Sequence, residues 1–250
     1  MTTQRATARR IDWRRVLRLG VPILIAIGAL AGLAWLLPPS YPAFFAAIRA
    51  GCNPPAGWNI QQGQTALGGD RLDEALAAFS RAAQADPGCE PAFTGRAEAE
   101  HALREDQLAG DDFAQAVRLC PECQDAYVER GDMERDQGHL TAALSDYTAA
   151  IALGGPRTAE ALFERGRVYE WIGRLDPALA DFDRLMPSNP AFAPDPDILY
   201  ERALTYDAMG NQPGALADYT RFVSLADPAD FRLAHARQRI GALQAARPGP

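Results

Sequence analysis

The chain has 250 residues, of which 48% are hydrophobic and 23% charged, and its formal net charge is −7. This length accommodates one or two domains with a real core. The composition is too apolar for a disordered chain, the acidic balance argues against a nucleic-acid binder, and four cysteines are too few for a disulfide-dense mini-scaffold. All 25 basic side chains are Arg, and Ala, Gly and Pro are abundant, which is typical of GC-rich bacterial coding.

The basic residues are concentrated at the amino terminus. Residues 1–20 contain six Arg and one Asp, so they carry +5 while the remaining residues carry −12. The stretch from Leu19 to Ile48 has no charged residue, and its most apolar part runs from Val21 to Leu37. A helix ending at the Pro38-Pro39 pair would be roughly 30 Å long, which matches the hydrocarbon core of a bilayer.

We interpret residues 19–38 as an uncleaved signal anchor behind a basic cytoplasmic amino terminus, 1–18. The Arg-rich end stays in the cytoplasm by the positive-inside rule, so the rest of the chain is exported across a bacterial cytoplasmic (inner) membrane as a single-pass protein. The segment lacks the features of a cleaved signal peptide, a lipobox before Cys52 is broken by Arg49, and a twin-arginine signal is only loosely matched. Gly28 and Gly32 form a GxxxG that would allow a homodimer through the membrane helix.

After a linker over 39–55, one helix-turn-helix pattern recurs five times at steps of 34 to 37 residues. In the second helix of each unit a small residue is followed four positions later by an aromatic one: Ala75/Phe79, Ala109/Phe113, Ala143/Tyr147, Ala178/Phe182 and Ala215/Tyr219. In the first helix the small position is held by Gly63, Ala97, Gly131, Gly166 and Ala203. Most units end on a proline, namely Pro87, Pro121, Pro190 and Pro228.

Three units share a local signature, Tyr127-Val-Glu-Arg-Gly131, Phe163-Glu-Arg-Gly166 and Tyr200-Glu-Arg-Ala203. These residues and their period resemble the tetratricopeptide repeat (TPR) family, in the form of a bacterial membrane-anchored member. The resemblance implies an all-α, right-handed superhelix of five repeats over 56–89, 90–123, 124–158, 159–192 and 196–229. We expect an amphipathic capping helix over 230–246, followed by a tail, 247–250.

The resemblance also implies that the first helix of each repeat lines a concave groove that binds partner peptides. The positions expected to point into this groove are Asp125, Val128, Asp132, Arg135, Glu160, Phe163, Arg167, Glu170, Trp171, Asp197, Tyr200, Leu204 and Asp207. Carboxylates and three aromatic side chains would suit a basic or amphipathic peptide. The alternative is that the charges are solvated and the aromatics pack between repeats. The residues of the carboxylate clamp that holds chaperone C-termini are not present.

The four cysteines are Cys52, Cys89, Cys120 and Cys123. On the repeat frame they lie at one edge of the first two repeats, where an oxidising compartment would allow disulfides. The frame favours Cys52–Cys89 with Cys120–Cys123, and Cys89–Cys120 is the main competitor. Free thiols, a redox pair or half of a zinc site at Cys120-Pro-Glu-Cys123 are the other interpretations.

The sequence contains no pattern that predicts catalysis or a cofactor. The three histidines are scattered among different repeats, no set of residues has metal-ligand spacing, and no glycine-rich phosphate loop is present. We therefore predict a non-enzymatic scaffold that binds a protein or peptide partner in envelope assembly, secretion or maturation. The alternatives are a periplasmic chaperone-like factor for unfolded clients, of the cytochrome c maturation or translocon accessory type, and a cytoplasm-facing adaptor.

Overall fold

The computed structural model describes residues 42–188 and 193–246. These residues form twelve α-helices and confirm the predicted all-α repeat architecture. The helices are α2 (Pro42–Arg49), α3 (Pro54–Leu67), α4 (Leu72–Ala85), α5 (Glu90–Ala102), α6 (Asp106–Leu119), α7 (Gln124–Asp136), α8 (Leu140–Leu153), α9 (Thr158–Trp171), α10 (Leu175–Leu185), α11 (Pro196–Ala208), α12 (Gln212–Leu225) and α13 (Arg232–Ala245).

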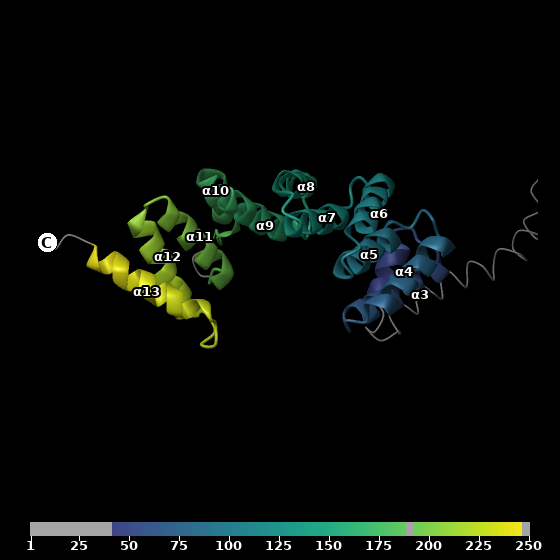
Figure 1. Cartoon of the computed structure of the whole chain (residues 1–250), viewed down its shortest axis with the longest axis horizontal. Helices are drawn as coiled ribbons and strands as arrows, with labels where there is room; N and C mark the ends of the chain where they lie inside the picture. The colour runs from purple at the N-terminus through teal and green to yellow at the C-terminus, as the bar shows by residue number, and fades with distance from the viewer. Residues whose placement is uncertain (1–41, 189–192, 247–250) are drawn as a thin grey trace, which may run out of the picture.

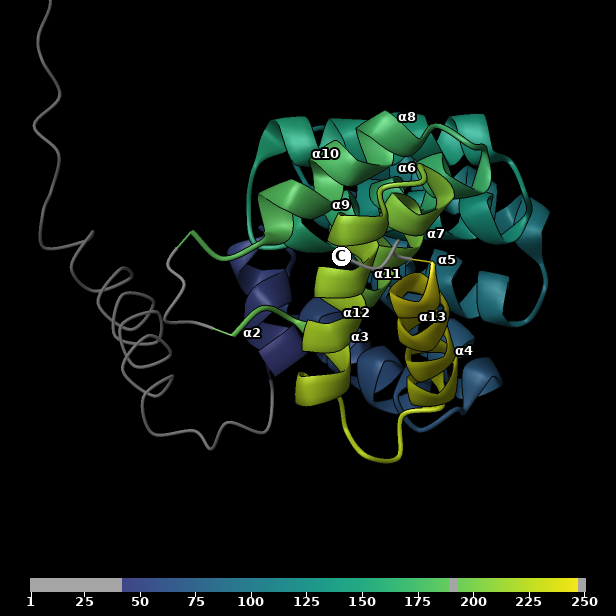
Figure 2. The same cartoon turned by 90° about the vertical axis from the view of Figure 1, so that its left-hand side faces the viewer.

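The helices pair in chain order and the pairs follow one another along a single long axis (Figure 1). The pairs are α3/α4, α5/α6, α7/α8, α9/α10 and α11/α12, and each second helix also packs against the first helix of the next pair. The view along the axis shows helices distributed around it and not in one plane (Figure 2). The fold is therefore an α-solenoid, in which each repeat buries its apolar face against its neighbours.

The two ends of the array are covered by single helices. At the carboxyl end α13 packs on α12, and at the amino end α2 packs on α3. Helix α2 falls within 39–55, where the sequence predicts only a linker; its apolar residues Ala43 and Ala47 pack into the core of the first repeat, which gives this short segment a reason to fold.

The basic terminus 1–18, the proposed membrane segment 19–38, Pro190 and the tail 247–250 lie outside the described residues. Within the described ranges, no helix combines the length and the apolar character that a bilayer crossing requires.

The turns and helix starts follow from local sequence. The turns inside three repeats contain Gly138, Gly173 and Gly210, each with φ between 73° and 78°, a region that glycine adopts at low cost. The second repeat has Arg104 at this place with φ 67°. Helix α3 begins with two prolines, and the Asn53 side chain accepts a hydrogen bond from the backbone N–H of Ala56 at 2.9 Å, which caps its first turn.

The core is built from the small and aromatic positions that define the period. Phe79, Tyr147 and Phe182 are fully buried, and each lies against a glycine of a first helix. A Cβ atom added at Gly63 would lie 2.7 Å from the Phe79 ring, and one added at Gly166 would lie 2.7 Å from the Phe182 ring. Such contacts are too short for packed carbon atoms, so the small residue is needed because the aromatic ring occupies its side-chain space.

A buried ion pair joins the two helices of every repeat except the first in the described chain. An Arg of the first helix forms a bidentate pair with an Asp sixteen residues later in the second helix, in Arg96–Asp112, Arg130–Asp146, Arg165–Asp181 and Arg202–Asp218. In the last three pairs the N–O distances are 2.6–2.9 Å. Arg130, Arg165 and Arg202 belong to the Glu-Arg signature of the sequence, and each of the four Asp residues directly precedes the buried aromatic residue of its second helix. The sequence did not indicate that these Arg and Asp residues are partners.

The same Arg residues reach the preceding repeat. Arg165 donates a hydrogen bond to Thr148 of α8 at 3.0 Å, and Arg202 pairs with Asp183 of α10 at 2.8 Å. The ion pair therefore lies where a repeat meets the second helix of the repeat before it.

Candidate peptide-binding groove

The first helices of neighbouring repeats enclose a cavity of about 690 Å³ near the amino end of the array. Its walls come from α2, α3, α5 and α7 and from the connections that precede α7 and α9, and no residue of α4, α6 or α8 lines it. First helices thus face the groove here, as the family resemblance implies. The residues that the sequence singled out lie mostly further along the array, and only Asp125 of that set lines this cavity.

Carboxylates dominate the polar lining of the cavity. Glu90 is buried and accepts a hydrogen bond from the Thr94 hydroxyl at 2.5 Å. Glu129 pairs with Arg157 at 2.5 Å. Burial raises the pKa of Glu90 and of Glu129. Burial, together with repulsion from the Glu129 carboxylate, raises the pKa of Glu98 to about 8.

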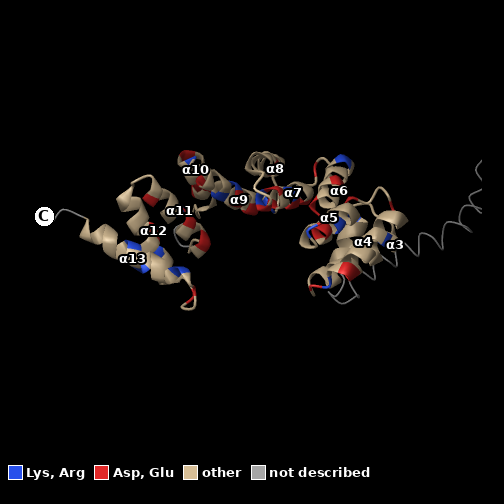
Figure 3. Cartoon of the chain, in the orientation of Figure 1, with Lys and Arg blue, Asp and Glu red and all other residues tan. Residues whose placement is uncertain are grey.

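The Glu of the repeated Glu-Arg motif forms ion pairs between repeats. Its Arg neighbour turns to the Asp of its own repeat, whereas the Glu meets an Arg associated with an adjacent first helix. The pairs are Glu129–Arg157 at 2.5 Å, Glu164–Arg135 at 2.6 Å and Glu201–Arg167 at 3.9 Å. Opposite charges are visibly interspersed along α7 and α9 (Figure 3). These Glu residues were missed as groove residues, although their place in the motif was a signal. Arg157 was also missed, and it lies outside the motif.

The predicted charged residues of the middle groove are largely paired with one another. Arg135 contacts Asp132 at 2.7 Å and lies 2.6 Å from Glu164, and Asp132 also accepts a hydrogen bond from the Tyr147 hydroxyl at 2.7 Å. Glu160 pairs with Arg157 at 2.6 Å, and this bond lowers the pKa of Glu160. These side chains form ion pairs within the protein, whereas the sequence led us to expect either free peptide ligands or solvated charges.

The apolar part of the predicted site lies on α9. Trp171 is 55% exposed, and the Arg167 guanidinium lies over its ring at 5.2 Å and over the Phe163 ring at 5.9 Å. Phe163 lines a smaller cavity of about 220 Å³ together with Glu160 and Asp197. The structure therefore brings Glu160, Phe163 and Asp197 together in one hollow, and Arg167 connects the Phe163 ring to the exposed Trp171 ring.

Two predicted apolar positions do not present a free surface. Val128 is 0% exposed and packs with Tyr147, Ala161 and Val168, so its assignment to the groove lining is wrong. The Val128 side chain points from α7 towards α8 and the next repeat, away from the concave side. Leu204 is half-buried and packs into the apolar cluster of α11, α12 and α13.

The terminal helix α13 packs against the predicted groove residues of the last repeat. The centroid of the Tyr200 ring lies 5.1 Å from that of Phe222, and the Tyr200 hydroxyl lies 2.9 Å from the Nδ1 atom of His235 of α13. Arg232 and Arg239 of this segment pair with Asp197 at 2.5 Å and Asp207 at 2.7 Å. Glu170 remains beside this region, and burial together with repulsion from Glu201 raises its pKa to about 7.

The four cysteines form two disulfides, with the pairing that the repeat frame favours. Cys52 joins Cys89, and Cys120 joins Cys123. The Cys52–Cys89 bond ties the connection between α2 and α3 to the start of α5, and both residues belong to the buried core. It therefore fixes α2, one wall of the large cavity, to the second repeat.

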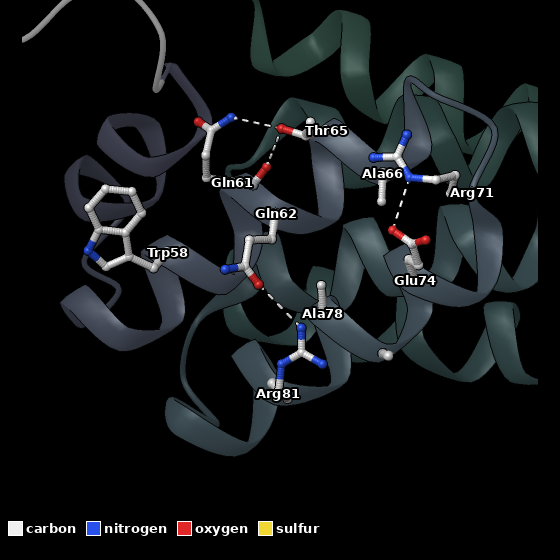
Figure 4. Close-up of a pocket in the computed structure, with 10 residues that line it drawn as sticks. Trp58, Gln61, Gln62, Thr65, Ala66, Arg71, Glu74, Ala78 and Arg81 are labelled. Atoms are coloured by element: carbon white, nitrogen blue, oxygen red, sulfur yellow. Dashed lines mark hydrogen bonds and ion pairs between the residues drawn. The ribbon is translucent and has the colours of Figure 1, made fainter.

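A second hollow, of about 680 Å³, lies on the first repeat outside the groove (Figure 4). It is bounded by Trp58 and Gln62 of α3 and by Ala78 and Arg81 of α4. Gln62 and Ala78 stand 34 residues before Arg96 and Asp112, so they occupy the positions of the ion pair that the other repeats possess. Arg81 instead donates a hydrogen bond to Gln62 at 3.3 Å.

Metal binding has no support within residues 42–188 and 193–246, where no three His, Cys, Asp or Glu residues are arranged to hold an ion.

Known proteins resemble the chain in its repeats. Tetratricopeptide repeat protein 36 of Bos taurus is 40% identical over 75 residues, which are 29% of this chain and 40% of that protein. The human protein is 37% identical over the same length. The chain thus spans about 40% of the length of these relatives.

Solved structures share the fold. PilW, described as a widely conserved type IV pilus biogenesis factor, aligns with a TM-score of 0.62 at 21% identity over 77% of this chain and 92% of its own. YrrB, described as a TPR protein with an unusual peptide-binding site, aligns with a TM-score of 0.58 at 24% identity over 78% of this chain and 98% of its own. The family model of the tetratricopeptide repeat matches residues 60–122 and 128–196, more than half of the chain. The chain belongs to the tetratricopeptide repeat family, whose members are generally non-catalytic scaffolds for protein–protein interaction.

Proposed function

We propose that the protein is a bacterial membrane-anchored scaffold whose repeats lie outside the cytoplasm and bind a peptide segment of a protein partner in the groove. The partner would act in envelope assembly, secretion or maturation. The observation that carries the binding function is the cavity of about 690 Å³ lined by first helices, since it offers a concave surface with both apolar and acidic side chains and has the size of a ligand site.

Export is supported by sequence and chemistry together. The uncharged segment 19–38 follows an Arg-rich terminus, which favours a carboxyl-terminal domain outside the cytoplasm. Two disulfides suit an oxidising compartment, because cytoplasmic reductants keep thiols reduced. Anchoring at residues 19–38 would place the first repeat and α2 closest to the membrane.

Alkaline phosphatase fused behind Pro250 should be active in cells that make the full chain, because this enzyme folds only where disulfides form. A fusion that lacks residues 1–38 is the matched control and should be inactive. If the full-length fusion is inactive while a fluorescent protein at the same place is bright, the protein is the cytoplasm-facing adaptor and the export proposal is wrong.

Removal of an exposed aromatic from the groove should weaken partner capture. We expect Trp171→Ala to reduce the amount of cross-linked partner recovered from cells about tenfold, because central aromatic side chains contribute about 2 kcal/mol or more to protein interfaces. Trp171 is 55% exposed, so its loss leaves the core intact. Quantitative mass spectrometry after in-cell cross-linking gives the measurement.

Leu108→Ala is the control for this experiment, since Leu108 is 51% exposed and lies on α6, which does not line the groove cavity. It should leave partner recovery unchanged. Equal recovery with Trp171→Ala and wild type would remove α9 from the binding site. Capture of many unrelated unfolded proteins, without a defined partner, would favour the chaperone-like function.

A further inference from the structure

The large cavity holds more negative charge than its own basic groups neutralise. Its lining includes one guanidinium, that of Arg157, and five carboxylates, those of Glu90, Glu98, Glu122, Asp125 and Glu129. Arg157 is already engaged, at 2.5 Å with Glu129, at 2.6 Å with Glu160 and at 3.8 Å with Asp125. The described lining therefore has no free cation for the remaining carboxylates.

Glu98 is the carboxylate that this imbalance affects most. It extends from α5 into the cavity, where it is partly buried, and no hydrogen bond or ion pair reaches it from the residues that the structure describes. Partial burial disfavours the charged form of a carboxyl group without a hydrogen-bond partner, and repulsion from Glu129, Asp125 and Glu90 adds to this effect, while attraction by Arg157 offsets part of it. A polar group in this condition is stabilised by a ligand that brings a positive charge.

The rest of the lining fits the shape of such a ligand. The same lining includes the apolar side chains of Ala43, Ala46 and Ala47 of α2 and of Ile60 of α3. A long basic side chain has an apolar methylene stem and a charged end, and it binds best where both are matched. The lining of the cavity contains both kinds of surface, and no group of residues within it has the arrangement of a metal site.

We propose that this cavity binds the charged end of an Arg or Lys side chain of the partner peptide, with Glu98 and Glu129 as its carboxylate ligands and α2 as the wall for its stem. The proposal rests on the proposed function, because it assigns the chemistry of one subsite in the same groove.

A defined probe tests the subsite. A fluorescein-labelled Gly-Ser peptide with one central Arg is compared, by fluorescence anisotropy with the purified full chain in neutral detergent, with the same peptide that carries citrulline, the neutral isostere of Arg. At about pH 8.5 and low salt we expect about tenfold tighter binding of the Arg peptide, the value of one charge-assisted contact. Glu98→Gln should remove most of that preference, and Asp111→Asn on the exposed surface of α6 should retain it.

The pH dependence of the affinity for the Arg peptide distinguishes a specific role of Glu98 from a general loss of negative charge. In the free protein Glu98, with a pKa of about 8, binds a proton at neutral pH, and the guanidinium must compete with that proton. Affinity of the wild type for the Arg peptide should therefore rise on the order of tenfold from about pH 6.5 to about pH 8.5, and then level off. The guanidinium does not titrate in this range, and in Glu98→Gln the rise should disappear.

Equal affinity for the two peptides, an equal loss in Asp111→Asn and Glu98→Gln, or a pH rise that persists in Glu98→Gln would each overturn the cation subsite. So would absence of binding of the Arg peptide to the wild type. If a cross-linked cellular partner is still captured and lost with Trp171→Ala, the peptide-binding function stands and only the cation subsite fails. Loss of both results would refute the two proposals together.

Discussion

Replacement of Asp181 with Ala should lower the free energy of unfolding by about 3 kcal/mol, because it leaves the Arg165 guanidinium buried without its partner. The side chains of Arg165 and Asp181 are only 14% and 5% exposed, and two hydrogen bonds of 2.7 and 2.8 Å join them. Removing one member of a buried pair costs about 3–5 kcal/mol, mainly through the charge that remains. Urea unfolding followed by far-UV circular dichroism measures the change.

Two comparisons separate this effect from ordinary surface electrostatics. Glu74→Ala breaks the Arg71–Glu74 pair, whose side chains are 49% and 68% exposed, and should change stability by less than about 1 kcal/mol. The double replacement Arg165→Met with Asp181→Leu removes both charges and should recover at least half of the loss caused by Asp181→Ala. A loss in Asp181→Ala no larger than that in Glu74→Ala would show that the repeated ion pair is not a stabilising element.

The second large effect is expected at the disulfide between the first two repeats. Cys52→Ser with Cys89→Ser should lower the free energy of unfolding by about 3–4 kcal/mol, since the bond closes a loop between residues 37 positions apart. The same chain-entropy relation gives about 2 kcal/mol for Cys120 and Cys123, which are three positions apart. The order of the two losses is the prediction, and denaturant midpoints of the two double variants measure it.

Reduction of the wild type provides the control for the serine replacements. With excess dithiothreitol its stability should fall towards that of a variant in which all four cysteines are Ser, which should be lower still because Ser hydroxyls at the buried positions 52 and 89 are less favourable than thiols. A serine variant at Cys52 and Cys89 that is as stable as oxidised wild type would mean that the noncovalent contacts of α2 and α3 already hold this end of the array.

Much of the fold was predictable because the residues that recur in each repeat are those that make steric contacts between its two helices. A glycine at position 63 or 166 and an aromatic ring sixteen residues later are two halves of one contact, so the sequence alone locates both helices and their packed faces. The same frame brought the ends of antiparallel helices to one edge and favoured the observed cysteine pairs. These features depend on distances within one or two repeats.

The groove was less predictable because its contacts cross repeats. Whether the Glu or the Arg of the shared motif turns to the concave side depends on the rotation between neighbouring helices, and the pairs Glu164–Arg135 and Arg165–Asp181 show that adjacent residues diverge. Val128 has the right period for the groove but meets the core of the next repeat. Tyr200 is covered by α13, whose position on the last repeat no spacing rule defined.

The first repeat, which has Gln62 and Ala78 in place of the ion pair, is also the repeat that the Cys52–Cys89 bond fastens to its neighbour. In a linear array each unit is held only by adjacent units, so the terminal unit frays first unless another force holds it. Here a covalent bond joins the first two repeats at the amino end of the array, where the ion pair of the other repeats is missing. An array of this kind is complete only after oxidation, and its first repeat, with the α2 wall of the cavity, would melt independently of the others in a reducing cell compartment.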